Sequence, residues 1–130
     1  MTVKYYDNYY WVLSNGAILI VNHDPDIAEL FAAGLENGGF KTIICNDALS
    51  AVEKIRSSPD KFSLVLVDRT SQQDTDFPKQ VKKINNKMKV VLSSAFSFRD
   101  VEISNSGYDR ILQLPITMSK LASIVREVLG

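Results

Sequence analysis

The feature that most constrains this chain is a repeated alternation between short apolar runs and segments of helical periodicity. Continuous apolar runs occupy residues 17–21, 64–67 and 90–92, and residues 41–45 and 111–114 are interpreted as two further strands. Uninterrupted apolar runs are typical of strands that are covered on both faces, as in a parallel sheet. Parallel strands need long crossover connections, and helices supply them here. The pattern therefore predicts an α/β fold, with a doubly wound, five-stranded parallel sheet inside a three-layer sandwich.

Capping residues and helix breakers predict five helices. Asp24 followed by Pro25 favours a helix start, because a capping carboxylate precedes proline at the first helical position. The apolar positions of this first helix, which include Ile27 and Leu30, recur at helical spacing until Gly38. The other predicted helices span residues 48–57 after a cap at Asp47, residues 77–84, residues 99–106, and residues 121–129 after a cap at Thr117.

Charge and cysteine content exclude several classes of protein. Lys plus Arg and Asp plus Glu each number 15, so the chain lacks the basic excess that nucleic-acid binding usually requires. The single cysteine, Cys45, cannot form an internal disulfide and is interpreted as a buried apolar residue. No apolar stretch reaches the roughly 20 residues of a membrane span, and the N-terminus has no signal-peptide pattern. A cytoplasmic setting is expected.

The first 16 residues differ from the rest and are interpreted as an aromatic extension of a domain at residues 17–130. They hold four of the five tyrosines and the only tryptophan. Asn15 and Gly16 form a hairpin-turn signal, although the first strand should already be paired on both edges. The segment is expected either to pack on the domain or on a second chain, or to be a poorly ordered tail.

Polar side chains follow several of the predicted strands. In an open parallel sheet, ligands bind beyond the carboxyl ends of the strands, near the switch point of the strand order. Asp68, which ends an apolar run, is expected to lie exposed there, either as a functional carboxylate or as a residue that caps the loop. The other residues at this edge are Asn22, His23, Ser94, Leu114 and Pro115.

The chain from residue 17 to residue 129 resembles the receiver domain of response regulators. The resemblance rests on the segments ILIVNHDPDI, LVLVD, VVLSSA and GYDRILQLP, in this order and at these separations. It implies a flavodoxin-like fold with strand order 2-1-3-4-5. It also implies a signalling domain of a two-component phosphorelay, and not an enzyme. Such a domain would accept a phosphoryl group from a histidine kinase onto Asp68, with Ser94 in contact with that group.

Several positions depart from the receiver pattern. Receivers place two acidic residues after the first strand to hold Mg²⁺, and here those positions are Asn22 and His23. Asp24 comes one place later, where it is expected to cap the helix and point away from the site. Leu114 replaces the lysine that precedes the proline, and Ile111 replaces the aromatic switch residue.

These replacements are expected to weaken phosphoryl transfer, which depends on neutralising charge at the phosphoryl oxygens. Mg²⁺ prefers carboxylate oxygen, whereas Asn22 offers a weak carbonyl ligand and His23 suits transition metals better. Leu114 cannot donate to phosphate, and Arg69 would replace the missing charge only in part. A local hydrogen bond is the competing interpretation for His23. The candidate metal ligands are Asp68, His23 and the backbone of Thr70.

Three functional hypotheses follow. In the first, the chain is a pseudo-receiver that keeps the fold and Asp68 and acts through protein–protein contacts. In the second, it is a working but atypical receiver that a cognate kinase phosphorylates on Asp68. The third is a flavodoxin-like protein that binds flavin or another small ligand. It would need a phosphate-binding loop rich in Ser, Thr and Gly, which residues 22–25 do not provide.

The resemblance also implies where partners dock. Receivers usually dimerise or bind partners on the face built from the fourth helix, the fifth strand and the last helix. The expected partner is a sensor histidine kinase or a downstream signalling protein, with a homodimer as a further alternative and no nucleic acid or membrane. A dimer surface that involves Tyr9 and Trp11 would contradict this face. In this chain, the partner face implied by the resemblance would include Val101, Tyr108, Arg110, Lys120 and Ser123.

Overall fold

A computed structural model of the chain describes residues 16–69, 76–95 and 107–130. In this part of the chain, strands and helices alternate over most of the length. The elements are β1 (Ala17–Val21), α2 (Pro25–Asn37), β2 (Thr42–Cys45), α3 (Ala48–Ser57), β3 (Phe62–Asp68), α4 (Phe77–Ile84), β4 (Lys89–Ser94), β5 (Arg110–Gln113) and α6 (Met118–Leu129).

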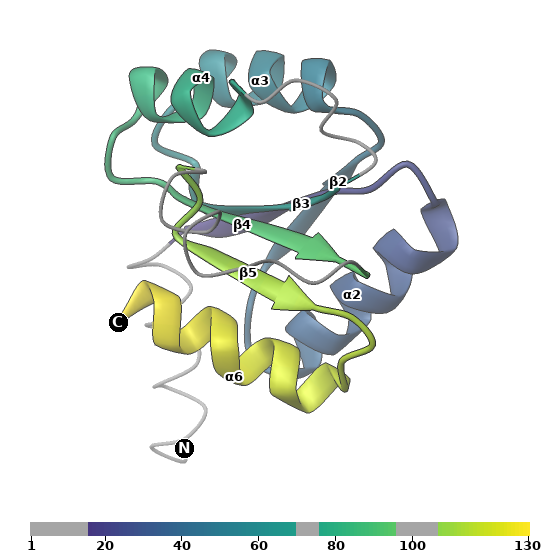
Figure 1. The fold of residues 1–130 in the computed structure, drawn as a ribbon. Coiled ribbons are helices and arrows are strands. Elements are labelled where there is room, and N and C mark those ends of the chain that lie inside the picture. Colours follow the sequence, from purple (N-terminus) through teal and green to yellow (C-terminus); the bar gives the residue numbers. More distant parts are fainter. Residues whose placement is uncertain (1–15, 70–75, 96–106) are drawn as a thin grey trace.

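The five strands form one parallel sheet with the order β2-β1-β3-β4-β5. Helices α2 and α6 cover one face of the sheet, and α3 and α4 cover the other, so that the molecule has three layers (Figure 1). The predicted fold class and strand order are therefore confirmed. The described residues contain four helices where five were predicted, and the predicted helix at residues 99–106 lies outside them.

The helices begin where the sequence places their caps. The Asp24 carboxylate accepts hydrogen bonds from the backbone N–H groups of Asp26 and Ile27, and Pro25 takes the first helical position of α2. The Asp47 carboxylate accepts from the Ser50 N–H at the start of α3. A side-chain oxygen in this position satisfies one of the backbone donors that every helix start leaves unpaired. Thr117 caps α6 in the same way, through the Lys120 N–H.

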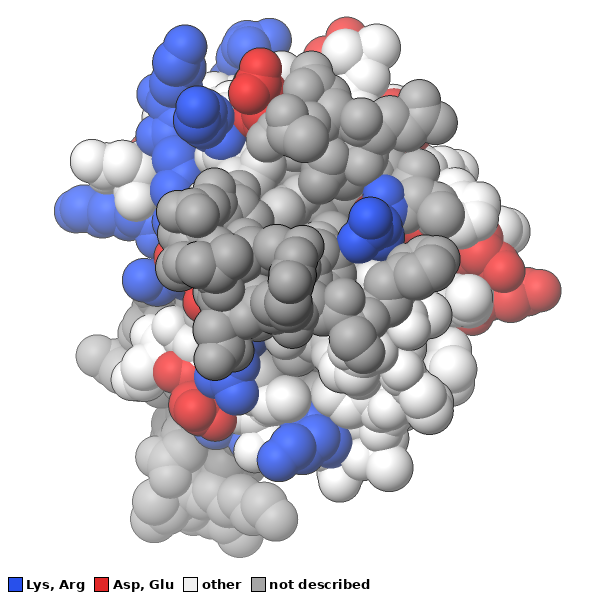
Figure 2. Space-filling view, in the orientation of Figure 1, with Lys and Arg blue, Asp and Glu red and all other residues white. Residues whose placement is uncertain are grey.

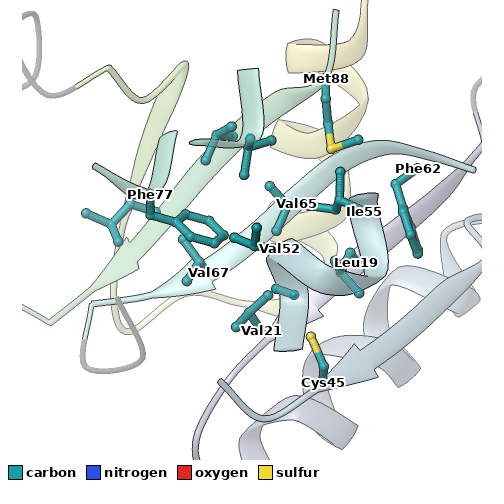
Figure 3. Packing of buried hydrophobic residues seen from close by; sticks show 14 of the residues in the cluster. Leu19, Val21, Cys45, Val52, Ile55, Phe62, Val65, Val67, Phe77 and Met88 are labelled. Carbon is teal, nitrogen blue, oxygen red and sulfur yellow. The ribbon is translucent and has the colours of Figure 1, made fainter. Parts of the chain in front are cut away.

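Two clusters of buried apolar side chains fill the spaces between the layers. Leu19 and Val21 point into the cluster beneath α3 and α4, which Figure 3 shows together with Val65 and Phe77. Ile18 and Ile20 belong to the cluster beneath α2 and α6. Successive side chains of a strand point to opposite faces, so a strand between two helical layers must be apolar at every position.

The strand ends differ slightly from the predicted ones, and this affects the edge where the site lies. Strand β5 ends at Gln113, so that Leu114 and Pro115, joined by a cis peptide bond, follow the strand. The extension expected at residues 1–16 lies outside the described residues except for Gly16, which precedes β1. None of the described helices is both long enough and apolar enough to cross a bilayer.

Candidate functional site

A small pocket of about 160 Å³ opens at the carboxyl ends of the strands. Because all five strands run in the same direction, the residues after β1, β3, β4 and β5 meet at this edge. The pocket thus collects most of the positions that the sequence singled out there, although they are far apart along the chain. Its lining consists of Asn22, His23, Ile27, Asp68, Arg69, Ser93, Ser94, Ala95 and Leu114.

Asp68 is buried, with 8% of its surface exposed, so the prediction that it lies exposed at the sheet edge is wrong. The reason is that β3 is the middle strand of the sheet and its pairing extends through Asp68, whose Cα partner is Ser93 on β4. The next residue is tied down as well, since the Arg69 N–H donates to the Ser93 carbonyl over 3.0 Å. Asp68 therefore forms the floor of the pocket and not the start of the loop.

His23 covers this carboxylate. Its Nδ1 lies 3.0 Å from Oδ2 of Asp68, while 60% of the imidazole side chain remains exposed against 11% of the Asp68 side chain. An ionised carboxylate only accepts hydrogen bonds, so Nδ1 must carry the proton and donate it. The sequence suggested a local hydrogen bond for His23, whereas this bond is made to a residue 45 positions away.

Asn22 and Asp24, which also follow β1, accept hydrogen bonds from nearby backbone N–H groups. Oδ1 of Asn22 accepts a hydrogen bond from the Asp24 N–H over 2.9 Å. The Asp24 carboxylate caps α2, as the sequence predicted, and accepts from Asp26 over 3.0 Å and from Ile27 over 3.4 Å. Both side chains stabilise the turn between β1 and α2, which leaves Asp68 as the carboxylate of the pocket lining.

The side chains described at this site do not fit a magnesium ion. Mg²⁺ takes oxygen ligands in near-ideal octahedral geometry and relies on carboxylates. Here Asp68 supplies one carboxylate, the Asn22 oxygen already accepts a hydrogen bond, and His23 presents nitrogen. Within the described residues, no group of three His, Cys, Asp or Glu side chains could hold a metal. Thr70, whose backbone was a candidate ligand, lies outside that part of the chain.

The remaining lining of the pocket is mostly uncharged. Ser93 and Ser94, at the end of β4, are each 1% exposed, and Leu114 stands where a cation was expected from the resemblance. Arg69 is exposed and is the one cationic side chain among the described residues that line this pocket. A phosphoryl group on Asp68 would therefore meet hydroxyl groups, one imidazole and one guanidinium.

Sequence reasoning missed three residues of the lining, Ser93, Ile27 and Ala95. Ser93 precedes Ser94 in the run that carried the resemblance, but only the strand register puts it opposite Asp68. Ile27 lies in the first turn of α2 and was assigned to the apolar positions of that helix. In the structure it is 37% exposed and forms part of the pocket wall.

Ile111 was placed among the pocket positions, and the structure places it elsewhere. It lies on β5 and packs, partly buried, against the cluster beneath α3 and α4, as does Tyr108. Burial raises the pKa of Tyr108. Ile111 also lines a separate groove of about 440 Å³ between β5 and α6, together with Arg110 and Lys120. The aliphatic side chain of Ile111 thus contributes to the sheet edge and not to the Asp68 pocket.

No protein-family model matches the chain. The chain is similar to the transcriptional regulatory protein ZraR of Klebsiella oxytoca, with 32% identity over 117 residues. The aligned region covers 87% of this chain and 26% of that protein, so this chain spans only about a quarter of its relative's length.

Solved structures with the same fold agree with this likeness. A CheY-like response regulator receiver domain protein from Methanospirillum hungatei JF-1 superposes with a TM-score of 0.76 and 24% identity, over 88% of this chain and 93% of that one. A response regulator from Thermotoga maritima superposes with a TM-score of 0.77 and 19% identity, over 88% and 98%. The sheet order and these structures show that the chain has the fold of CheY-like response regulator receiver domains, and the sequence likeness to ZraR agrees with that fold.

Proposed function

We propose that this chain is a pseudo-receiver, a receiver domain that signals through protein–protein contacts without forming a stable phosphoryl-aspartate at Asp68. The observation that carries the proposal is the hydrogen bond between His23 and Asp68. In a phosphorylated receiver, the acceptor carboxylate needs a metal ion beside it, and here an imidazole stands in that position. The proposal places the protein in a two-component pathway as a binding module and not as an enzyme.

The charge balance of the pocket supports this proposal. Phosphoryl transfer is accelerated mainly by positioning and by cations that neutralise the developing negative charge. The pocket has a single carboxylate, which is insufficient for Mg²⁺, and Leu114 cannot contact phosphate through a hydrogen bond. Each of these losses removes a contact of the kind that contributes several kcal/mol to the transition state.

The second candidate function is an atypical phospho-accepting receiver, and Arg69 favours it. Arg69 lines the pocket, and a guanidinium can bind two phosphate oxygens at once. With a protonated His23, it would supply positive charge without a metal. A third candidate, a flavin-binding protein, is disfavoured because ligand pockets usually measure about 300–1,000 Å³, and the pocket at this edge measures about 160 Å³.

The test is intact-protein mass after incubation with acetyl phosphate and Mg²⁺. We expect no phosphoryl adduct on the parent chain, and none on Asp68→Asn. A single adduct on the parent that is absent from Asp68→Asn would overturn the proposal and favour the atypical receiver.

A restored variant makes the negative result informative. Asn22→Asp, His23→Asp and Leu114→Lys together return the two carboxylates and the cation to the pocket, and we expect this triple variant to form an adduct that depends on Mg²⁺. Adding Asp68→Asn to the triple variant should abolish the adduct. A matched control that carries Leu114→Met in place of Leu114→Lys keeps the carboxylates but lacks the cation, and its adduct should form more slowly.

We further propose that the partner is a sensor histidine kinase or a downstream signalling protein in the cytoplasm, and that no nucleic acid or membrane is bound. The groove between β5 and α6, which includes Arg110 and Lys120, is the described part of the partner face expected for receivers. Ser123 is exposed on α6, and Val101 lies outside the described residues.

A further inference from the structure

Two helices on opposite sides of the sheet each carry charged side chains of a single sign. Helix α4 and the turn to β4 carry the lysine face, defined here as Lys79, Lys83 and Lys87. Between Phe77 and Val90 there is no Asp or Glu. Figure 2 shows Lys and Arg side chains gathered at the upper left, over α4 and the turn that follows it, and acidic side chains at the right, over α2.

Helix α2 carries the acidic face, defined here as Asp26, Glu29 and Glu36. All three residues are exposed, and α2 contains no Lys or Arg. These positions lie close together on the helix surface, because residues three, seven and ten places apart share one side of an α-helix. The two faces carry three charges each, of opposite sign, in a chain whose net charge is zero.

Part of each face is electrostatically unfavourable within one molecule, although Asp26 and Lys83 complement the dipoles of their own helices. Lys79 lies in the first turn of α4, where the helix dipole disfavours a cation, and Lys79 and Lys83 are like charges four residues apart. Glu36 lies in the last turn of α2, which has no basic residue. Nearby Lys82 pairs with Asp109 over 2.7 Å, whereas the three lysines of the lysine face form no ion pair with another described residue.

The acidic face also exposes apolar surface. Leu30 is 54% exposed and Ile27 is 37% exposed, and both lie on α2 beside the carboxylates. A central apolar area with a polar rim is typical of a surface that binds another protein. Lysine side chains suit such a surface, because their aliphatic stems can cover apolar atoms while the ammonium groups reach the carboxylates.

We propose that the acidic face of one copy docks on the lysine face of a second copy of this chain. The charge complementarity of the two faces favours this partner. Nucleic acid is disfavoured because the lysine face has no arginine to bind phosphate bidentately, and because the chain has no net positive charge. Helices α2 and α4 cover opposite sides of the sheet, so the contact joins different surfaces and leads to head-to-tail assembly. The proposal is independent of the state of Asp68.

Sedimentation of the full chain at several protein concentrations tests the contact. We expect the weight-average mass to rise above the 14.6 kDa monomer with concentration at low ionic strength. The mass should return to that of the monomer near 1 M salt, where the Debye length is about 3 Å. Asp68→Asn should associate like the parent chain, because it changes neither face.

Two neutralised variants test which surfaces meet. The first carries Lys79→Gln, Lys83→Gln and Lys87→Gln, and the second carries Asp26→Asn, Glu29→Gln and Glu36→Gln. Each variant alone should dissociate at least roughly tenfold more readily than the parent, as expected for the loss of three exposed ion pairs. An equimolar mixture should form a 1:1 dimer and nothing larger, because it contains one intact lysine face and one intact acidic face.

Circular dichroism of both variants should match the parent, since all six side chains are exposed. A parent chain that stays monomeric at low ionic strength, or a mixture that forms no dimer, would overturn the proposal. The proposal would also be overturned if a duplex DNA oligonucleotide bound the monomeric parent but not the lysine variant. That result would show that the lysine face binds nucleic acid.

Discussion

The Asp68 carboxylate is both buried and hydrogen-bonded to His23. Taking a charged group out of water is costly unless a partner compensates for the lost hydration. The N–H group of His23 provides such compensation from a side chain that stays mostly in solvent. The same contact holds an imidazole against the buried Asp68 carboxylate, so the stability of the pocket depends on two residues that lie 45 positions apart in the chain.

We expect the pair to show a measurable coupling. His23→Ala should lower the free energy of unfolding, and a double-mutant cycle with Asp68→Ala should give a coupling of about 1 kcal/mol, within the range that residues in contact usually show. Denaturant titrations of the four proteins would measure it. As a control, His23→Ala and Asp47→Ala should be additive, because Asp47 caps a different helix. Additivity of His23 with Asp68 would contradict the structure.

Cys45 illustrates burial without a compensating partner. Desolvation raises the pKa of its thiol to about 11, and nearby Lys54 lowers it by a smaller amount. Because this pKa is raised on folding, the associated stability is present below the ordinary value of 9.0 and is lost as the pH rises towards 11. We expect native protein at pH 8 to react with an aromatic disulfide reagent far more slowly than the unfolded chain. Rapid stoichiometric labelling of the native protein would contradict this, and Cys45→Ser is the blank.

At the scale of the elements, α2 and α6 approach each other closely because α2 has glycine at the contact. A Cβ atom on Gly34 would lie 2.8 Å from the Cβ of Met118, and one on Gly38 would lie 2.8 Å from the Cβ of Ala122. Glycine inside a helix normally costs about 1 kcal/mol relative to alanine. At Gly34, the close packing of α2 against α6 outweighs this loss of helix propensity, because a larger residue would meet Met118.

Gly34→Ala should therefore destabilise the protein, although alanine favours the helix. The added methyl group meets the base of the Met118 side chain, which cannot swing away, and overpacking of this kind costs about 1–3 kcal/mol. The matched control is the neighbouring exposed position, where Ala33→Gly should cost about 1 kcal/mol through helix propensity alone. Urea titrations would compare the two variants with the parent, and an increase in stability for Gly34→Ala would contradict the packing.

At the scale of the whole molecule, the sheet couples two apolar clusters that do not touch across it. Leu19 and Ile20 are neighbours on β1 and fully buried, yet they belong to different clusters. Strand β1 pairs with β2 on one side and with β3 on the other, so unfolding of β1 would disrupt both clusters.

Leu19→Ala and Ile20→Ala should each cost about 2–5 kcal/mol, as is usual for truncating a buried aliphatic side chain. Both variants should shift the same single unfolding transition, monitored by circular dichroism and by hydrogen exchange of the backbone amides. Probes that diverge in only one of the variants would show that the two sides of the sheet unfold separately.

The sequence predicted the parallel strands and the helix caps well, since buried central strands and capping residues leave local patterns, whereas the order of the strands came from the resemblance to receiver domains. It failed where the outcome depends on neighbours. The small side chains Ala28 and Ala32 face the sheet with Phe31 and Leu35, so the more apolar Leu30 stays exposed. The prediction for Asp68 was wrong because strand pairing extends one residue further than the apolar run. The contact between His23 and Asp68 joins residues far apart in the chain and leaves no local pattern at all.

The separation of the lysine and acidic faces also contributes an electric dipole to the described part of this molecule, although the net charge of the chain is zero. Such a particle should bind in a preferred orientation to both cation- and anion-exchange resins at low salt. Near its calculated isoelectric point of about 6.6, its solubility should rise when salt is added, because the ions screen attraction between oppositely charged sides of neighbouring molecules. The colloidal behaviour of the protein is thus set by where its charges lie and not by their sum.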